Sequence, residues 1–100
     1  MDLDNKVSLV TGAGQGIGEG IAKNLASKGS KVIVVDLNQQ SSENVAEKIN
    51  AKFPNSAFSF QADLTKSDEI ESMLEFGVLK FNKIDCVCNN AASSRGIGPV

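Results

Sequence analysis

The sequence predicts an α/β fold in which helices cover both faces of a doubly wound parallel sheet. Short apolar segments of strand length alternate with amphipathic segments of helical length along the 100-residue chain. A glycine-rich turn joins the first strand to the first helix. Strands that alternate with helices favour parallel pairing through right-handed crossovers. We therefore expect one domain, residues 1–100, in the order β-α-β-α-β-α-β with strand order 3-2-1-4.

The first expected strand covers residues 7–11 and runs directly into glycines. Apolar residues then recur at helical spacing between Ile17 and Ala26, and Gly29 stands where this helix should end. The segment KVIVVD, residues 31–36, is the second strand. Its uninterrupted apolar run is typical of a strand that is covered on both faces.

The second helix is expected over residues 42–53, where Pro54 stops it, and the third strand over SAFSFQAD, residues 56–63. Thr65 followed by Asp68 resembles a capping box and predicts the start of a third helix. The apolar residues expected on its inner side, with a close-packing point at Gly77, are Ile70, Met73, Leu74, Val78 and Phe81.

The fourth strand, IDCVCNNA at residues 84–91, contains both cysteines of the chain, Cys86 and Cys88. A metal site requires further ligands and the chain has no histidine, so we expect no metal site and two reduced, buried thiols. With no fifth strand beside it, this strand is expected to be an apolar edge of the sheet.

Charge and hydropathy exclude several classes of protein. The formal net charge is −2 and no basic block is present, which predicts no nucleic-acid or membrane-surface partner. Apolar runs are of strand length, and the first residues, MDLDNK, do not resemble a signal peptide. We therefore expect a cytoplasmic protein.

The glycine-rich turn has the pattern T-G-x-x-x-G-x-G, formed by Thr11, Gly12, Gly16 and Gly18, and not G-x-G-x-x-G. Free N–H groups and the helix dipole at such a turn attract a pyrophosphate, and the missing side chains allow close approach. Asp36 follows Gly16 by 20 residues, as a dinucleotide fingerprint requires. A tight structural turn is the alternative, but the pattern favours binding of an adenine dinucleotide.

The sequence TGAGQGIG at residues 11–18 resembles the cofactor motif of the short-chain dehydrogenase/reductase family, which has a Rossmann-type fold. Asp36, Asp63-Leu64 and Asn89-Asn90-Ala91 stand at the family's usual places after the second, third and fourth strands. The family's pattern usually continues with glycine, where this chain has Ala92.

The resemblance implies a set of cofactor-binding residues. Gly12, Gly16 and Gly18 would shape the pyrophosphate loop, which the backbone at Gln15 and Ile17 would line. The side chain of Asp63 and the backbone of Leu64 would flank the adenine. Asn90 and Ala91 would lie near the ribose next to the nicotinamide, while Asn89 would tie the sheet together.

NAD is expected as the cofactor in preference to NADP. Asp36 can accept hydrogen bonds from the adenosine ribose, and its charge would oppose a 2′-phosphate. NADP-preferring relatives carry a base at positions that are Gln15 and Leu37 here, and both are neutral. Capping of the following turn is the alternative role for Asp36.

The resemblance implies hydride transfer between NAD(H) and an alcohol or carbonyl substrate. The family's catalytic serine, tyrosine and lysine lie beyond the fourth strand, and this chain contains no tyrosine. We therefore expect the first half of the fold, truncated before strand five, with no catalytic residue and no activity alone. The full-length protein is expected to form a homo-oligomer.

Two alternatives remain. A non-catalytic module that binds NAD or another protein would explain the glycine motif without the catalytic residues. An S-adenosylmethionine methyltransferase would share the glycine loop and the acid, but it would not explain Asn89-Asn90-Ala91. The substrate and the direction of the reaction are not predicted.

Overall fold

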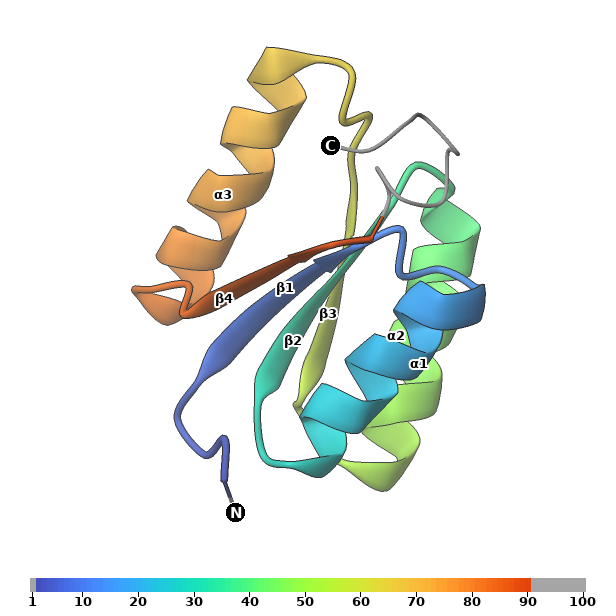
Figure 1. Cartoon of the computed structure of the whole chain (residues 1–100), viewed down its shortest axis with the longest axis vertical. Coiled ribbons are helices and arrows are strands. Elements are labelled where there is room, and N and C mark those ends of the chain that lie inside the picture. The colour runs from blue at the N-terminus through green and yellow to red at the C-terminus, as the bar shows by residue number, and fades with distance from the viewer. Residues whose placement is uncertain (1, 91–100) are drawn as a thin grey trace.

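A computed structural model describes residues 2–90 as a four-stranded parallel sheet with three helices (Figure 1). The elements are β1 (Val7–Thr11), α1 (Gly16–Ser27), β2 (Lys31–Asp36), α2 (Gln39–Lys52), β3 (Ala57–Gln61), α3 (Ser67–Phe81) and β4 (Cys86–Asn89). The strand order is β3-β2-β1-β4. The predicted fold class, element order and strand order are therefore confirmed.

Strand β1 lies in the middle of the sheet, paired in parallel with β2 on one side and β4 on the other. Thr11, its last residue, is level with Val35 of β2 and with Asn89 of β4. The carboxyl ends of the strands therefore meet at one edge. The glycine loop, the turn after β2 and the end of β4 all lie at this edge, where doubly wound folds bind their ligands.

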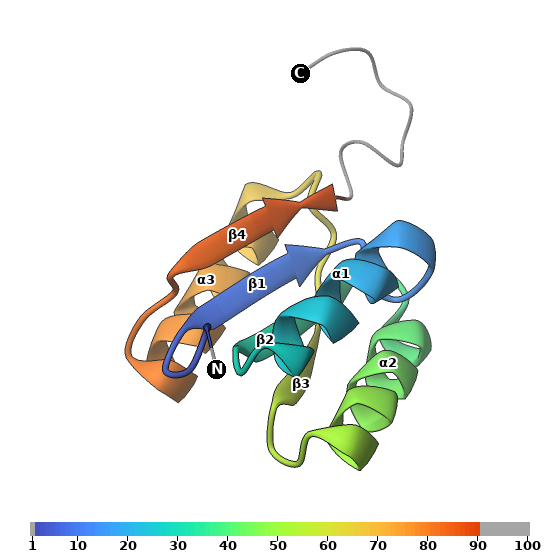
Figure 2. The same cartoon turned by 60° about the horizontal axis from the view of Figure 1, so that its bottom comes forward.

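Helices α1 and α2 cover one face of the sheet and α3 covers the other (Figure 2). Because side chains alternate along a strand, the apolar run of β2 serves both faces. Val32 and Val34 belong to the core beneath α1 and α2, while Ile33 and Val35 belong to the core that includes Met73 of α3. Each of these four β2 residues is fully buried, which stabilises the fold by about 1.5–3 kcal/mol per side chain.

Several element boundaries differ from the prediction. Helix α2 begins at Gln39, three residues before the expected start, because the side chain of Asn38 caps it by accepting a hydrogen bond from the Ser41 N–H at 3.0 Å. Strand β3 spans Ala57–Gln61 and not residues 56–63, and strand β4 begins at Cys86, two residues after the expected start, and ends at Asn89.

The capping box predicted from Thr65 and Asp68 is wrong. Helix α3 begins at Ser67, and Lys66 at its N-cap makes no side-chain capping bond. The Thr65 hydroxyl instead donates to Asp63 Oδ1 at 2.6 Å. Since this hydroxyl is already engaged with the preceding carboxylate, the chain continues for one more residue before the helix begins.

The inner side of α3 is narrower than predicted. Met73 and Gly77 are buried, and Ile70 and Phe81 pack partly against the same core. Leu74 and Val78 are exposed, so their predicted place on the inner side is wrong. Gly77 is a close-packing point, as expected, because a Cβ there would lie 2.7 Å from the Ile84 side chain and 2.9 Å from that of Ile33.

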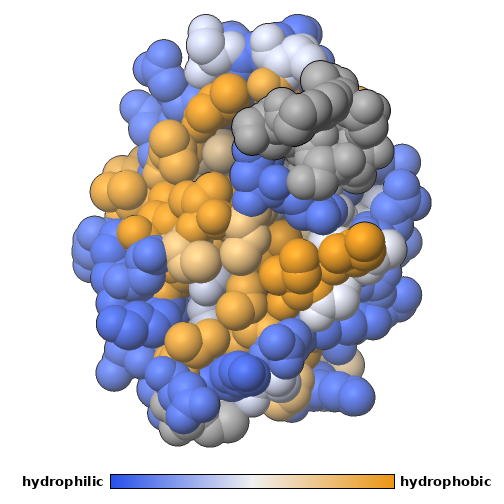
Figure 3. All heavy atoms as spheres, in the orientation of Figure 1, coloured by the Kyte–Doolittle hydropathy of each residue, from blue (hydrophilic) through white to orange (hydrophobic). Residues whose placement is uncertain are grey.

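Within residues 2–90, strand β4 is an edge of the sheet, as predicted, and it pairs only with β1. Figure 3 shows hydrophobic residues gathered on the surface over α3 and β4. The exposed large apolar residues of these two elements are Leu74, Val78, Leu79 and Val87. We call these four residues the open apolar surface.

The two cysteines are not buried, contrary to the prediction. Cys86 is exposed and Cys88 is half-buried, and neither forms a disulfide. Their exposure follows from the position of β4 at the edge of the sheet, where no further strand or helix of the described residues covers them. No helix within residues 2–90 is long and apolar enough to cross a membrane.

Candidate functional site

The loop between β1 and α1 has a conformation that favours glycine. Gly12 and Gly16 have φ angles of 62° and 58°, in the left-handed region that residues with a Cβ rarely adopt. Between them, Ala13 is fully buried, and its N–H donates to the Val35 carbonyl at 2.9 Å. The loop is therefore fixed against the end of β2 before it enters the helix.

Gly18 lets the first turn of α1 lie directly against this loop. A Cβ at Gly18 would stand 2.1 Å from the carbonyl oxygen of Gly12 and 2.8 Å from Nδ2 of Asn90. The Asn90 side chain also donates to that Gly12 oxygen at 3.3 Å. Two glycines and one asparagine thus form a close contact between the loop, the helix and the end of β4.

The N-terminus of α1 opens at this loop without a side-chain cap. Gln15 occupies the N-cap position, but its side chain makes no capping hydrogen bond. Ile17 in the first turn is 76% exposed although it begins the apolar pattern of the helix. The first N–H groups of a helix have no intrahelical partner and carry partial positive charge, so an uncapped end of this kind is suited to an anion.

The acid in the first turn of α1 is neutralised by neighbouring lysines. Glu19 lies 2.7 Å from the Lys23 ammonium and 3.6 Å from that of Lys48. The hydrogen bond from Lys23 holds the pKa of Glu19 below its usual value. The carboxylate is therefore paired with cations, which weakens its repulsion of an anion at the helix N-terminus.

Asp36 joins the glycine loop to the turn after β2. Its Oδ2 accepts the Gly14 N–H at 2.8 Å, and its Oδ1 accepts the Asn38 N–H at 2.9 Å. A Cβ at Gly14 would lie within 2.8 Å of the same carboxylate oxygen and within 2.7 Å of Ser41 Cβ. Asp36 does cap the following turn, as the alternative interpretation held, and it also fixes the loop.

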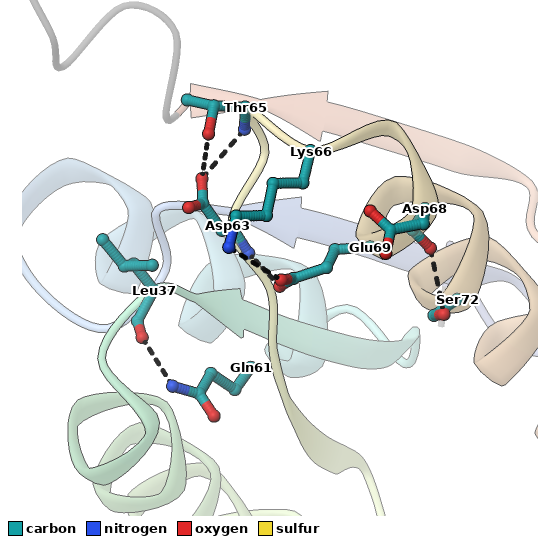
Figure 4. Close-up of polar contacts among 8 residues, drawn as sticks. All are labelled: Leu37, Gln61, Asp63, Thr65, Lys66, Asp68, Glu69 and Ser72. Carbon is teal, nitrogen blue, oxygen red and sulfur yellow. Dashed lines mark hydrogen bonds and ion pairs between the residues drawn. The ribbon is translucent and has the colours of Figure 1, made fainter.

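The segment after β3 lies beside the end of β2 (Figure 4). The Gln61 side chain donates to the Leu37 carbonyl at 3.1 Å, which ties the two strand ends together. Asp63 accepts the Thr65 N–H at 3.0 Å through Oδ1, and its own N–H donates to Glu69 Oε1 at 2.7 Å. These bonds fix Asp63 at the sheet edge, and Leu64 packs partly against the core beneath α3.

The two asparagines at the end of β4 hold neighbouring parts of the site. The Thr11 hydroxyl donates to Asn89 Oδ1 at 3.0 Å, which connects β1 to β4, so Asn89 ties the sheet together as expected. Asn90 donates to the glycine loop through its contact with Gly12. Ala91, the next residue expected at the site, lies outside the described residues.

The expected residues therefore lie at one edge of the sheet. They form two groups held by close contacts and hydrogen bonds, and the segment after β3 that contains Asp63 lies beside them. Gly12, Gly18 and Asn90 form the first group, and Gly14 with Asp36 forms the second. Sequence reasoning gave no role to Gly14, Asn38 or Glu69, each of which holds a site residue. Only Gly14 had a signal, since it is a glycine that the T-G-x-x-x-G-x-G pattern leaves unexplained.

The arrangement is suited to holding an extended anionic ligand across the ends of several strands. The loop has glycine at three of its positions, Gly12, Gly14 and Gly16, the helix end is uncapped, and a carboxylate lies at the end of the neighbouring strand β2. Within residues 2–90 no three His, Cys, Asp or Glu side chains are grouped so that they could hold a metal ion.

Comparison with known proteins gives a consistent result. Residues 6–98 match the short chain dehydrogenase family. The 7alpha-hydroxysteroid dehydrogenase of Escherichia coli (strain K12) is 36% identical over 97 residues, which cover 97% of this chain and 36% of that relative. Zerumbone synthase of Zingiber zerumbet is 34% identical over 91 residues, which cover 91% of this chain and 33% of that protein.

Solved structures agree in fold. A crystal structure of hydroxysteroid dehydrogenase from Escherichia coli superposes with a TM-score of 0.83 at 34% identity, covering 87% of this chain and 37% of that one. The 3-ketoacyl-(acyl-carrier-protein) reductase of Brucella melitensis, complexed with NADH, gives a TM-score of 0.79 at 39% identity, covering 85% and 33%. This chain thus spans about a third of the length of these relatives.

Proposed function

This chain belongs to the short-chain dehydrogenase/reductase family, an oxidoreductase family, and on that premise we propose that residues 1–100 form an NAD-binding domain. The observation that carries the proposal is the close contact of Gly18 with Gly12 at an uncapped helix N-terminus. Gly12 and Gly16 carry no side chains, so the backbone there is open to the close approach that a pyrophosphate needs. In this proposal Gly12, Gly16 and Gly18 shape the loop, and the backbone at Gln15 and Ile17 lines it.

At the adenosine end, we assign the ribose contact to Asp36 and the adenine contacts to the Asp63 side chain and the Leu64 backbone. Each oxygen of the Asp36 carboxylate accepts one backbone N–H. A carboxylate has about four lone-pair sites, so it retains acceptor capacity for two ribose hydroxyls. The same charge would repel a 2′-phosphate, which supports NAD over NADP.

Titration calorimetry with NAD and NADP on the folded 100-residue chain tests this assignment. We expect NAD to bind the wild type more tightly. Asp36→Asn keeps an oxygen acceptor for the Gly14 N–H while removing the charge, so it should lose discrimination without freeing the loop. Asp36→Ala removes both the oxygen acceptor and the charge, and it should weaken the binding of NAD further.

Leu37→Arg provides a matched gain-of-charge variant. Leu37 is 57% exposed, so the substitution should leave the fold intact while placing a cation where NADP-preferring relatives carry one. We expect its NADP affinity to rise about tenfold, equivalent to about 1.4 kcal/mol. Tighter binding of NADP than of NAD by the wild type would overturn the assignment, and no binding of either would overturn the domain's function.

At the nicotinamide end, we place Asn90 and Ala91 near the second ribose. The nicotinamide, when bound, supplies or accepts a hydride, and we propose an alcohol or carbonyl compound as the substrate of the whole protein. Two of the relatives, a hydroxysteroid dehydrogenase and a ketoacyl reductase, are consistent with that class. The chain's own part in this reaction is to hold the coenzyme at the sheet edge.

The 100 residues contain no tyrosine, so they do not supply the phenol on which the family's proton transfer depends. We propose that they bind NAD without turnover, and we propose a cytoplasmic homo-oligomer for the whole protein. Incubation of the chain with NAD and a panel of secondary alcohols should give no NADH absorbance above the blank. Formation of NADH by an activity that copurifies with the chain would contradict this expectation.

A further inference from the structure

A cavity lies between helices α1 and α2, on the face of the sheet that these helices cover (Figure 2). Its volume is about 580 Å³, within the range of about 300–1,000 Å³ that is usual for small-molecule sites. All of its lining residues fall within residues 23–27, at the end of α1, and 48–53, at the end of α2. The glycine loop lies at the opposite end of α1, so the cavity is separate from the proposed coenzyme site and is built without β4 or the residues after it.

The floor of the cavity is apolar. Ile49 is 2% exposed, and Phe53 packs against the core cluster to which Ile49 belongs. The Phe53 N–H donates to the Ile49 carbonyl at 2.8 Å, which closes the last turn of α2 and places the two residues one turn apart. They therefore form an apolar strip along the cavity, and such a strip suits an alkyl chain, whose removal from water is favourable.

Three lysines line the same cavity, and they share a single carboxylate. Lys23 and Lys48 both pair with Glu19, at 2.7 Å and 3.6 Å. Within residues 2–90, Lys52 forms no ion pair. Lys48 and Lys52 are four residues apart on α2, a spacing at which like charges repel. The rim of the cavity therefore carries an excess of positive charge that an anion would neutralise.

The helix ends limit the charge that this anion can carry. Helix α1 ends at Ser27 and α2 at Lys52, so the partial negative charge of two helix C-termini lies at the cavity. The helix N–H groups that bind phosphates lie at the other end of each helix. A dianion would thus be opposed by both helix ends and held by lysine side chains alone. A monoanion with a large apolar part fits the cavity better.

We propose that the cavity between α1 and α2 binds a medium-chain fatty carboxylate. The alkyl chain lies along Ile49 and Phe53, out of water. The carboxylate lies between Lys48 and Lys52, where it separates two like charges. The lining residues of α1 form the opposite wall. This binding is independent of the proposed coenzyme site.

Sodium decanoate is the probe for the test, added to the ¹⁵N-labelled 100-residue chain and followed by NMR and calorimetry. We expect one decanoate per chain, with a dissociation constant of about 1 mM or lower. Amide shifts should be largest in residues 23–27 and 48–53, and NAD should not displace the ligand. Decanol has the same chain without the charge, and butyrate has the same charge on a short chain. Each should bind about tenfold more weakly than decanoate.

Substitution of Lys52 tests the role of the positive rim. Lys52 is exposed, so Lys52→Gln should leave the fold intact and weaken decanoate binding about fivefold, while Lys52→Arg should retain the binding. Lys80→Gln is the matched control, because it removes the same charge from an exposed residue of α3, on the other face of the sheet. It should leave decanoate binding unchanged.

Three results would each overturn the proposal. Equal binding of decanol and decanoate would show that the lysines do not recognise the ligand. Equal losses in Lys52→Gln and Lys80→Gln would show a general effect of net charge. Amide shifts centred on residues 12–18, with displacement by NAD, would place the carboxylate at the coenzyme site instead.

Discussion

Strands β1 and β4 are both short and apolar and lie next to each other, yet their surroundings differ. All five residues of β1 are buried, whereas none of the four residues of β4 is fully buried. In the described part of the chain, β1 is paired on both sides and covered on both faces, while β4 is paired on one side only. Exposure of these strands is thus determined by their neighbours in the sheet and not by their composition.

The same contrast separates the β1–α1–β2 unit from the α3–β4 unit. The first unit carries the glycine loop and Asp36 on a closed core. The second presents the open apolar surface and joins the sheet through few buried residues of α3, chiefly Met73 and Gly77. The proposed coenzyme site therefore rests mainly on the β1–α1–β2 unit, and it depends on the α3–β4 unit at the end of β4 and at Glu69 of α3, which holds Asp63.

Met73→Ala should have the largest effect, because Met73 is only 4% exposed and is the one buried apolar side chain of α3 within residues 2–90. We expect the free energy of unfolding to fall by about 2–5 kcal/mol, measured by urea denaturation. The control is Leu79→Ala on the same helix, which is 85% exposed and should change stability by less than about 0.5 kcal/mol. Equal effects of the two substitutions would contradict the described packing of α3.

Gly18→Ala should have the next largest effect, and it lies in the β1–α1–β2 unit. The new methyl would meet the Gly12 carbonyl, a backbone group that cannot move aside easily. We expect a loss of about 1–3 kcal/mol in stability and at least tenfold weaker NAD binding by calorimetry.

Gly20→Ala is the matched control for this substitution. Gly20 is in the same helix, and a Cβ there meets no atom within 4 Å. Alanine should stabilise the helix by about 0.5–1 kcal/mol and leave NAD binding unchanged. If Gly20→Ala weakened binding as much as Gly18→Ala, the contact with Gly12 would not be the cause.

Val87→Lys tests whether the open apolar surface causes self-association. Val87 is 52% exposed on the edge strand, so a lysine should cost little stability while opposing strand-to-strand pairing between chains. By sedimentation velocity, we expect the wild type to self-associate and the variant to do so about tenfold more weakly. Gln40→Lys on α2 adds the same charge elsewhere and should not change association; a strictly monomeric wild type would contradict the prediction.

Asp85→Asn should have the smallest effect, at the junction between β1 and β4. The Val7 N–H donates to Asp85 Oδ2 at 2.8 Å, and this bond, with Lys83 adding to it, holds the pKa of Asp85 below its ordinary value. A lowered pKa stabilises the fold above the unfolded value of about 3.9, and the contribution is lost as pH falls through the folded value.

Thermal unfolding of the wild type and of Asp85→Asn checks this prediction at pH 7, 5 and 3. The wild type should have the higher Tm at pH 7, and the gap should begin to narrow as the pH falls below the unfolded value of about 3.9 towards the lowered pKa of the folded state. A gap that stays constant with pH would show that the charge of Asp85 contributes nothing.

The features that could be predicted from the sequence are those that depend on neighbouring residues in the chain. The apolar run of β2 and the glycine pattern after β1 are local, and both predicted their elements correctly. The capping box failed because Thr65 has two possible hydrogen-bond partners, and the preceding Asp63 was closer than the helix N-terminus. Local pattern cannot decide between such competing partners.

Other features depend on the assembled sheet. The bond between Gly14 and Asp36 joins residues 22 positions apart, and it exists only because β1 and β2 lie side by side. The exposure of Cys86 likewise depends on what lies next to β4, which residue type does not reveal. The cofactor motif could therefore be found from the sequence, but the contacts that hold its residues could not.

The bond from Asn90 to the carbonyl of Gly12 links residues 78 positions apart in the chain. During synthesis, the glycine loop leaves the ribosome well before Asn90, whose side chain donates this bond, has been added. The bonds from the loop to β2 can form earlier, but the contact with Asn90 can form only after β4 docks. A nascent chain that ended before Asn90 would carry the complete glycine motif and still lack the hydrogen bond from Asn90 to Gly12.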